Sequence, residues 1–293
     1  MRKVLFSLVL FIFAGFASAQ TAHGIVKEGL TIQSKILGKS VRYTIYLPAD
    51  YNTSERYYPV VYLLHGYSDN DMGWLQFGEI NRIADEGISK GDIPPMIIAM
   101  PDGGVSFYIN NFNGTVKYED FFFKEFLPYI ESTYRIRAEK RYRGISGLSM
   151  GGWGTLVYSL RHPDMFAACA AFSSAVWSDD EIINESEEDW KAFGEHLFGP
   201  FSGKARINET FKSYSPFHII KDNPADMFKS LRMYIDCGDD DFLTKGNCML
   251  HIALKEMNIQ HEFRVRDGAH QWSYWRSGIV EGLKFIGMSF QQF

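Results

Sequence analysis

Short apolar runs that alternate with helical patterns are the feature that most constrains the fold of this chain. Such runs predict strands at Val60–Leu64, Met96–Met100, Arg143–Leu148, Phe166–Phe172, Leu231–Cys237 and His261–Arg266. Helices are predicted among them at Glu79–Ser89, Tyr118–Thr133, Trp153–Arg161, Asn247–Met257 and Trp272–Phe290. Apolar strands separated by helices predict an α/β fold, with a mostly parallel sheet covered by helices on both faces.

One hairpin and one long connection complete the predicted organisation. Thr31–Leu37 and Val41–Leu47 are two further strands, joined at a sheet edge by Gly38-Lys39-Ser40, which brings the sheet to eight strands. Without repeats or low-complexity linkers, residues 20–293 are expected to form one domain. Residues from about 175 to 230 interrupt the alternation with a polar, aromatic-rich segment. Its length predicts a lid-like insertion over a binding site, with a purely structural helical insertion as the alternative.

The first 19 residues have the three parts of a secretory signal peptide. A basic start precedes an apolar run from Val4 to Phe16 and the small residues Ala17-Ser18-Ala19, with cleavage expected after Ala19. The apolar run is short for a bilayer span, which makes a membrane anchor the weaker alternative. The sequence therefore predicts an exported protein, periplasmic or secreted, with no membrane span after cleavage. The remaining residues carry 28 Lys and Arg against 35 Asp and Glu, with no basic patch for nucleic acid.

The three cysteines form no complete disulfide framework, because their number is odd. Cys169 and Cys237 lie in apolar strand-like runs and are expected to be buried free thiols, while a bridge between Cys237 and Cys248 stays open. No Cys and His pairs have the spacing of zinc ligands, so we expect no metal and no cofactor.

The sharpest motif is the G-x-S-x-G pattern of Gly147-Leu148-Ser149-Met150-Gly151, between a predicted strand and a predicted helix. A nucleophile elbow needs this pattern, because the turn is too tight for side chains on either side of the serine. We therefore expect Ser149 to be a nucleophile at the start of a helix in an α/β-hydrolase fold.

A serine nucleophile needs a base and an orienting carboxylate, which follow it in the order acid, then histidine, in this fold. Among the histidines after Ser149, His270 alone lies in a loop after the last strand, so we expect it to be the base. The acid is expected in the loop after the preceding strand, where Asp239, Asp240 and Asp241 are adjacent. We favour Asp241, with Asp240 as the alternative.

Two backbone N–H groups are expected to bind the oxyanion, those of Tyr67 and Met150. His65 lies upstream of Ser149 and is expected to brace its loop by hydrogen bonding. Two tryptophans are candidate substrate-binding residues: Trp272 as part of an acyl pocket and Trp177 as a stacking surface for a phenolic ring or a sugar. Trp153 and Trp275 are expected to be packing residues.

These segments together resemble the Putative esterase family of α/β hydrolases, which includes esterase D, the antigen 85 mycolyltransferases and the carbohydrate-esterase feruloyl esterases. The resemblance rests on four segments, Tyr62–Gly66, Gly147–Gly152, Gly238–Leu243 and Gly268–Arg276, the last with the pattern H-x-W-x-x-W. It implies Asp241 as the acid, because this is the third residue after the glycine.

The resemblance implies a serine carboxylic-ester hydrolase that works through an acyl-enzyme. With a signal peptide, it favours an enzyme acting on acyl or feruloyl esters of plant carbohydrate. Acyl transfer to a sugar by the same triad is the closest alternative, followed by a short-chain acyl esterase of the S-formylglutathione hydrolase type. A peptidase and a catalytically inactive binding protein on this fold are weaker alternatives.

Overall fold

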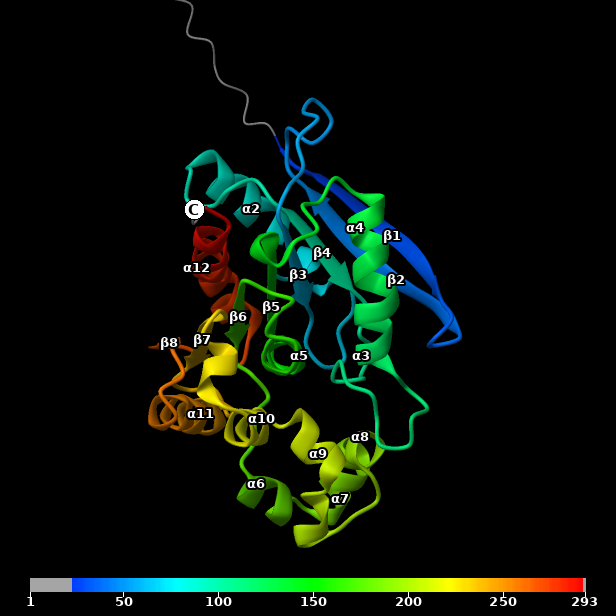
Figure 1. The fold of residues 1–293 in the computed structure, drawn as a ribbon, viewed down its shortest axis with the longest axis vertical. Coiled ribbons are helices and arrows are strands. Elements are labelled where there is room, and N and C mark those ends of the chain that lie inside the picture. Colours follow the sequence, from blue (N-terminus) through cyan, green and yellow to red (C-terminus); the bar gives the residue numbers. More distant parts are fainter. Residues whose placement is uncertain (1–22, 292–293) are drawn as a thin grey trace, which may run out of the picture.

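Eight strands form one mixed sheet in the computed structural model, which describes residues 23–291 (Figure 1). The strands are β1 (Ile25–Ser34), β2 (Lys39–Leu47), β3 (Val60–Leu64), β4 (Ile97–Pro101), β5 (Arg143–Leu148), β6 (Ala168–Phe172), β7 (Arg232–Gly238) and β8 (Glu262–Arg266). Their order is β1-β2-β4-β3-β5-β6-β7-β8, with β1 and β2 antiparallel to their neighbours and the other pairs parallel. The mostly parallel eight-stranded sheet predicted from the sequence is thereby confirmed.

The predicted signal peptide, residues 1–19, lies outside the described residues. Within residues 23–291, no helix combines the length and apolar character needed to cross a bilayer. The three cysteines of the chain are free thiols in this structure, so the open question of a Cys237–Cys248 bridge is answered against pairing.

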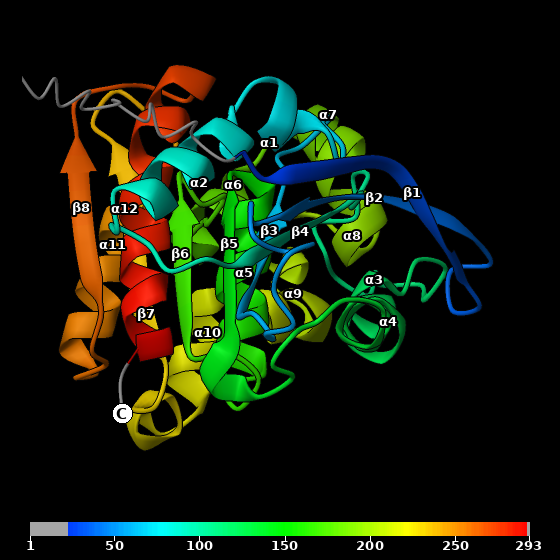
Figure 2. The ribbon, with the colours of Figure 1, turned by 90° about the horizontal axis from the view of Figure 1, so that it is seen from above.

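Helices cover both faces of the sheet, as the apolar strands predict (Figure 2). The main helices are α1 (Gly73–Gln76), α2 (Ile80–Ser89), α3 (Tyr118–Phe121), α4 (Leu127–Thr133), α5 (Met150–Arg161), α11 (Thr244–Glu256) and α12 (Trp272–Gln291). A π-helical turn, η1 (Phe122–Phe126), joins α3 to α4, and a 3-10 turn, η2 (Lys140–Tyr142), precedes β5. Because side chains alternate along a strand, Val61 and Leu63 pack toward α2 and α12, while Tyr62 and Leu64 pack toward α5.

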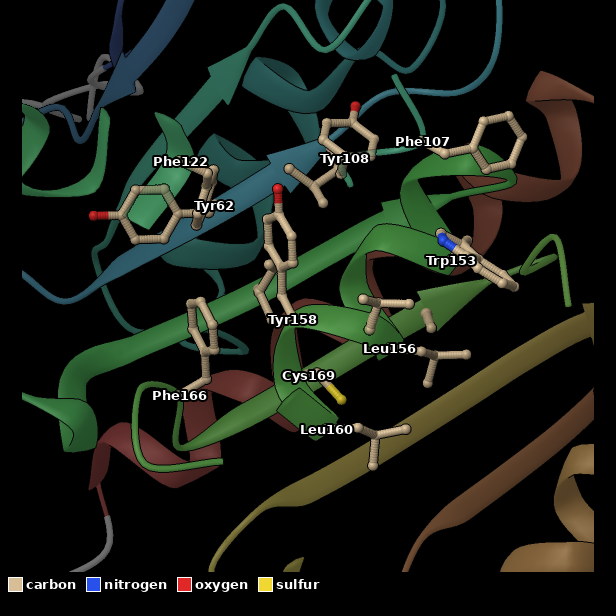
Figure 3. Packing of buried hydrophobic residues seen from close by; sticks show 14 of the residues in the cluster. Tyr62, Phe107, Tyr108, Phe122, Trp153, Leu156, Tyr158, Leu160, Phe166 and Cys169 are labelled. Carbon is tan, nitrogen blue, oxygen red and sulfur yellow. The ribbon is translucent and has the colours of Figure 1, made fainter. Parts of the chain in front are cut away.

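The layer on the α5 side is rich in aromatic rings (Figure 3). Phe122 lies 4.7 Å from Tyr158 and 5.4 Å from Tyr62 between ring centroids, and all three side chains are buried. Trp153 is fully buried in the same layer, in agreement with its expected packing role. The aromatic content of the chain therefore serves the core as well as the site described below.

The insertion is helical and projects from the lower end of the molecule in Figure 1. Its elements are α6 (Asp179–Asn184), α7 (Glu187–Asp189), η3 (Trp190–Gly194), α8 (Glu195–Phe198), η4 (Gly203–Arg206), α9 (Glu209–Tyr214), α10 (Pro216–Asp222) and η5 (Ala225–Phe228). Arg206 is fully buried, and its guanidinium donates to the carbonyls of Ile182 and Glu185 and to the Glu187 carboxylate. These hydrogen bonds connect the 3-10 turn η4 to α6, to α7 and to Glu185 between them within the insertion.

A buried carboxylate attaches the insertion to the rest of the protein. Glu119 in α3 accepts hydrogen bonds from Arg161 at 2.8 Å and from the Tyr214 hydroxyl at 2.7 Å, and it contacts His162 at 2.9 Å. Burial alone would raise the pKa of Glu119, but His162 and Arg161 outweigh burial and hold the pKa at about 2. The ionised carboxylate therefore stabilises the contact between α3, the end of α5 and α9.

We predict that Glu119→Gln lowers the free energy of unfolding by about 2–3 kcal/mol at pH 7, because it leaves Arg161 without its counter-ion. The pKa of Glu119 is lower in the folded chain than its ordinary value of 4.5. Its stabilisation is therefore present above pH 4.5 and is lost as the pH falls toward 2. Urea unfolding across this range should show the gap between wild type and variant narrowing. A gap independent of pH would contradict this account, and the exposed Glu86→Gln serves as the control with little effect.

Candidate active site

Ser149 occupies a strained turn between β5 and α5. Its backbone has φ 54° and ψ −117°, a conformation that side-chain-bearing residues rarely adopt. A Cβ atom added to Gly147 would lie 2.4 Å from the carbonyl oxygen of Gly151, and one added to Gly151 would lie 2.4 Å from that of Leu64. Both glycines are therefore required by close backbone packing, as the elbow motif predicts. Helix α5 begins at Met150, three residues before the predicted Trp153, because Gly151 and Gly152 belong to the helix.

The structure brings Ser149, His270 and Asp241 into one hydrogen-bonded chain. The Oγ of Ser149 lies 3.0 Å from Nε2 of His270, although the two residues are 121 positions apart in the sequence. The other ring nitrogen of His270, Nδ1, lies 2.8 and 3.0 Å from the two carboxylate oxygens of Asp241. The arrangement is the one expected of a nucleophile, its base and an orienting acid.

Asp241 is held as a buried anion. Burial alone would raise its pKa, but hydrogen bonds from His270, from the Leu243 amide and from the Ser173 hydroxyl offset burial and leave the pKa below its ordinary value. Ser173 receives a hydrogen bond at 2.9 Å from the indole of Trp275, which fixes its hydroxyl oxygen. A permanent negative charge therefore faces Nδ1 of His270.

The other two aspartates of the cluster lie elsewhere. Asp240 is exposed, and Asp239 accepts hydrogen bonds from the backbone N–H groups of Asp240 and Gly268. Of the three, Asp241 is therefore the one that contacts His270. The carboxylates of Asp239, Asp240 and Asp267 approach one another within 4.8 Å, but they are exposed and do not line the cavity around Ser149.

A second buried carboxylate fixes both ends of the loop that carries His270. Asp236 in β7 is fully buried and receives two hydrogen bonds from Arg266, at 2.9 and 3.0 Å, at the end of β8. It also accepts from the hydroxyls of Tyr234 and of Tyr274, the latter in the first turn of α12. Arg266 and Tyr274 flank the loop, so Asp236 limits where His270 can lie.

The loop after β3 lies directly over Ser149. A Cβ on Gly66 would lie 2.7 Å from the side chain of Leu148, which would then have to move, and 3.6 Å from Cβ of Ser149, so glycine at this position favours the close approach of the loop. Tyr67 follows Gly66 and lines the cavity together with Ser149, while Met150 directly follows the serine as the first residue of α5. The backbone N–H groups of Tyr67 and Met150 stay the predicted oxyanion donors.

His65 stabilises this loop through hydrogen bonds, as its position in the sequence predicts. Its Nε2 accepts a hydrogen bond from the N–H of Gly103 at 2.7 Å, and its Nδ1 therefore carries the proton and donates to the carbonyl of Gly66 at 2.8 Å. Burial lowers the pKa of His65, which keeps the ring neutral. The hydroxyl of Tyr108 adds a hydrogen bond to the His65 carbonyl.

Ser149 opens into a cavity of about 710 Å³, which we call the Ser149 cavity. Two sets of aromatic side chains line it. The first, the His270 wall, consists of Phe77, Phe242, Trp272 and Trp275. The second, the Tyr67 wall, consists of Tyr67, Phe107, Trp177 and Phe193. The insertion contributes Trp177 and Phe193, so it contacts the site as a lid-like element would.

Both tryptophans predicted to bind substrate, Trp177 and Trp272, line the Ser149 cavity. Trp275, expected only to pack, is buried but also contacts His270, with ring centroids 4.8 Å apart. Sequence reasoning did not identify the remaining aromatic residues of the two walls, Phe77, Phe107, Phe193 and Phe242, nor the supporting residues Ser173 and Asp236. Phe242 follows the predicted acid directly, and this adjacency is the one signal that points to it.

Comparisons with known proteins agree with this geometry. The model of the family described as Putative esterase matches residues 34–286. A structure described as a ferulic acid esterase superposes with a TM-score of 0.78 at 32% identity, covering 92% of this chain and 99% of that one. An acetyl esterase from Caldicellulosiruptor saccharolyticus is 24% identical over 88% of this chain and 96% of its own length.

An endo-1,4-beta-xylanase/feruloyl esterase from Xylanibacter ruminicola is 32% identical over 55% of this chain. The match spans only 23% of that much longer protein, so it covers one part of it. The superposed ferulic acid esterase and the sheet order show that the chain has an α/β-hydrolase fold. Because the family model covers well over half of its residues, the chain belongs to the Putative esterase family.

Proposed function

We propose that this protein is a serine carboxylic-ester hydrolase that works through an acyl-enzyme on Ser149. The observation that carries the proposal is the contact of Ser149 Oγ with His270 Nε2 at 3.0 Å, with Asp241 on the other ring nitrogen. The esterase family supports the same reaction class.

In the first half of the reaction, Ser149 Oγ attacks the ester carbonyl carbon while His270 Nε2 takes the hydroxyl proton. The N–H groups of Tyr67 and Met150 bind the negative oxygen of the tetrahedral intermediate. His270 then gives its proton to the alcohol oxygen, the carbon–oxygen bond breaks, and the acyl group stays on Ser149. Asp241 stabilises the imidazolium throughout.

The second half repeats these steps with water. His270 takes a proton from water, whose oxygen attacks the acyl-enzyme carbonyl. His270 returns this proton to Ser149 Oγ as the acyl group leaves as an acid. The reaction requires no cofactor, because the residues named carry each proton and each bond.

The role of His270 as proton donor indicates which wall of the Ser149 cavity faces the alcohol part of the ester and which faces the acyl part. The alcohol must leave beside Nε2 of His270, so the His270 wall faces the alcohol part of the ester. The acyl group extends away from His270 toward the Tyr67 wall. This assignment gives Trp177 the aromatic acyl ring and moves Trp272 to the alcohol side, whereas the sequence placed Trp272 in the acyl pocket.

Acyl or feruloyl esters of plant carbohydrate are the substrates we propose. A cavity of about 710 Å³ between two aromatic walls has room for a planar aromatic acyl group and part of a sugar. The relatives support this class, since two of them are described as feruloyl esterases and one as an acetyl esterase. The basic and apolar segments of residues 1–19 support export.

Replacement of the nucleophile tests the reaction. Ser149→Ala should lower kcat for p-nitrophenyl acetate and methyl ferulate by at least about 10⁴-fold, because no other group can hold the acyl. Circular dichroism and thermal unfolding should show a folded variant. Ester hydrolysis at the wild-type rate by this folded variant would rule out Ser149 as the nucleophile.

Replacement of the neighbouring aspartates tests the role of the acid. Asp241→Asn should lower kcat by about 10³- to 10⁴-fold, because an amide neither holds the required tautomer of His270 nor stabilises its charged form. Asp240→Asn is the matched control, one residue away and exposed, and should stay within a few-fold of wild type. Equal losses in the two variants, measured as kcat for the same ester, would argue against Asp241 as the orienting group.

A further inference from the structure

A second cavity of about 300 Å³ lies inside the insertion, and we call it the insertion cavity. Its lining is mainly apolar and includes the side chains of Ile182, Trp190 and Phe198, all of which are buried. The indole N–H of Trp190 donates to the carbonyl of Gly199 at 3.1 Å, so this ring presents only its apolar surface. The volume lies at the lower end of the range that holds small ligands.

The two cavities share a wall made of two rings. Trp177 and Phe193 line both the Ser149 cavity and the insertion cavity. Their ring centroids lie 5.8 Å apart, and Phe193 also contacts Phe107 at 4.9 Å and Tyr67 at 5.2 Å. Phe193 therefore closes the Tyr67 wall at the point where the insertion cavity begins.

Phe193 differs from Trp177 in the backbone that carries it. Both side chains are partly buried, but Phe193 lies in the π-helical turn η3, a local irregularity of a kind that often occurs at functional sites. Trp177 also contacts the fully buried Trp153, with ring centroids 5.8 Å apart, which anchors it to the core. A rotation of Phe193 away from Phe107 and Trp177 would connect the two cavities.

The charges around the insertion cavity limit what can enter it. Glu185 and Asp189 both line it. Burial and the nearby Asp189 raise the pKa of Glu185, and the neighbouring Arg206 only partly offsets them. An acyl group with a distal carboxylate would be repelled here, whereas an uncharged aromatic ring would pack against Trp190 and Phe198.

We propose that the insertion cavity is a second acyl subsite, which receives the far end of an acyl group extended by a second, uncharged aromatic ring, and that Phe193 is its gate. This inference rests on the proposed esterase function and on the acyl side of the Tyr67 wall. The first ring of the acyl group lies against Trp177 and Phe107, and the second passes Phe193 into the insertion cavity.

The test uses three p-nitrophenyl esters that share one alcohol, those of acetic, 3-phenylpropanoic and 3-(biphenyl-4-yl)propanoic acid. The 3-phenylpropanoate has only the first ring, so the ratio of kcat/KM for the biphenyl ester to that for the 3-phenylpropanoate reports on the second ring. The acetate reports on the hydrolytic reaction itself. Ala192→Trp places a large ring at the exposed edge of the insertion cavity and should lower this ratio by about 10-fold or more. Phe193→Ala opens the shared wall and should raise the ratio.

Phe201→Ala is the matched control. Phe201 belongs to the same insertion and packs on Phe112, but it lines neither cavity, so its removal should leave the ratio unchanged. The subsite proposal would be overturned if both Ala192→Trp and Phe193→Ala are folded, hydrolyse the acetate and leave the ratio unchanged. Absence of acetate hydrolysis in the wild type would instead contradict the proposed function, so the two failures are distinguishable.

Discussion

The close packing of two backbone segments around Ser149 is the constraint on which the rest of the site depends. Gly151 of the elbow helix lies against the carbonyls of Leu64 and His65, and Gly66 lies against Ser149. A side chain at Gly151 would collide with these carbonyls, so the close packing of the elbow and the loop after β3 depends on this glycine. The same contact holds the turn that carries Ser149 against the loop that leads to Tyr67.

Three buried carboxylates stabilise the segments around Ser149, namely the loop of His270, the insertion and the end of α5. Asp236 fixes the ends of the His270 loop through Arg266 and Tyr274, and Asp241 faces the ring of His270 itself. Glu119 connects the insertion to the end of α5, the helix that starts at the elbow. Each is compensated by hydrogen bonds from cationic groups, hydroxyls or amides, as a buried carboxylate requires. The helix of the nucleophile, the loop of the base and the insertion are therefore each held by at least one of them.

The sequence predicted the sheet, its helices and the residues of the hydrogen-bonded chain for physical reasons. Apolar strands and the glycines around Ser149 are local signals, and chain order in this fold limits the choice of His270 and Asp241. The bounds of β1 were less accurate, because a register shift between Lys27 and Leu30 interrupts its alternation. Beyond Trp177 and Trp272, most aromatic residues of the cavity walls were not predicted, because residues such as Phe107 and Phe193 are distant in sequence and meet only through the tertiary fold. Asp236 escaped it too, since an apolar strand gives no sign of which polar side chain it buries.

The central claim is that Ser149 forms a covalent bond with the acyl group. The most direct measurement treats the folded protein with a fluorophosphonate and locates the adduct by peptide mass spectrometry. We predict one adduct, on the peptide that contains Ser149, formed in step with the loss of ester hydrolysis. Complete loss of activity with the adduct on another residue, or full activity after Ser149 has been modified, would contradict the claim.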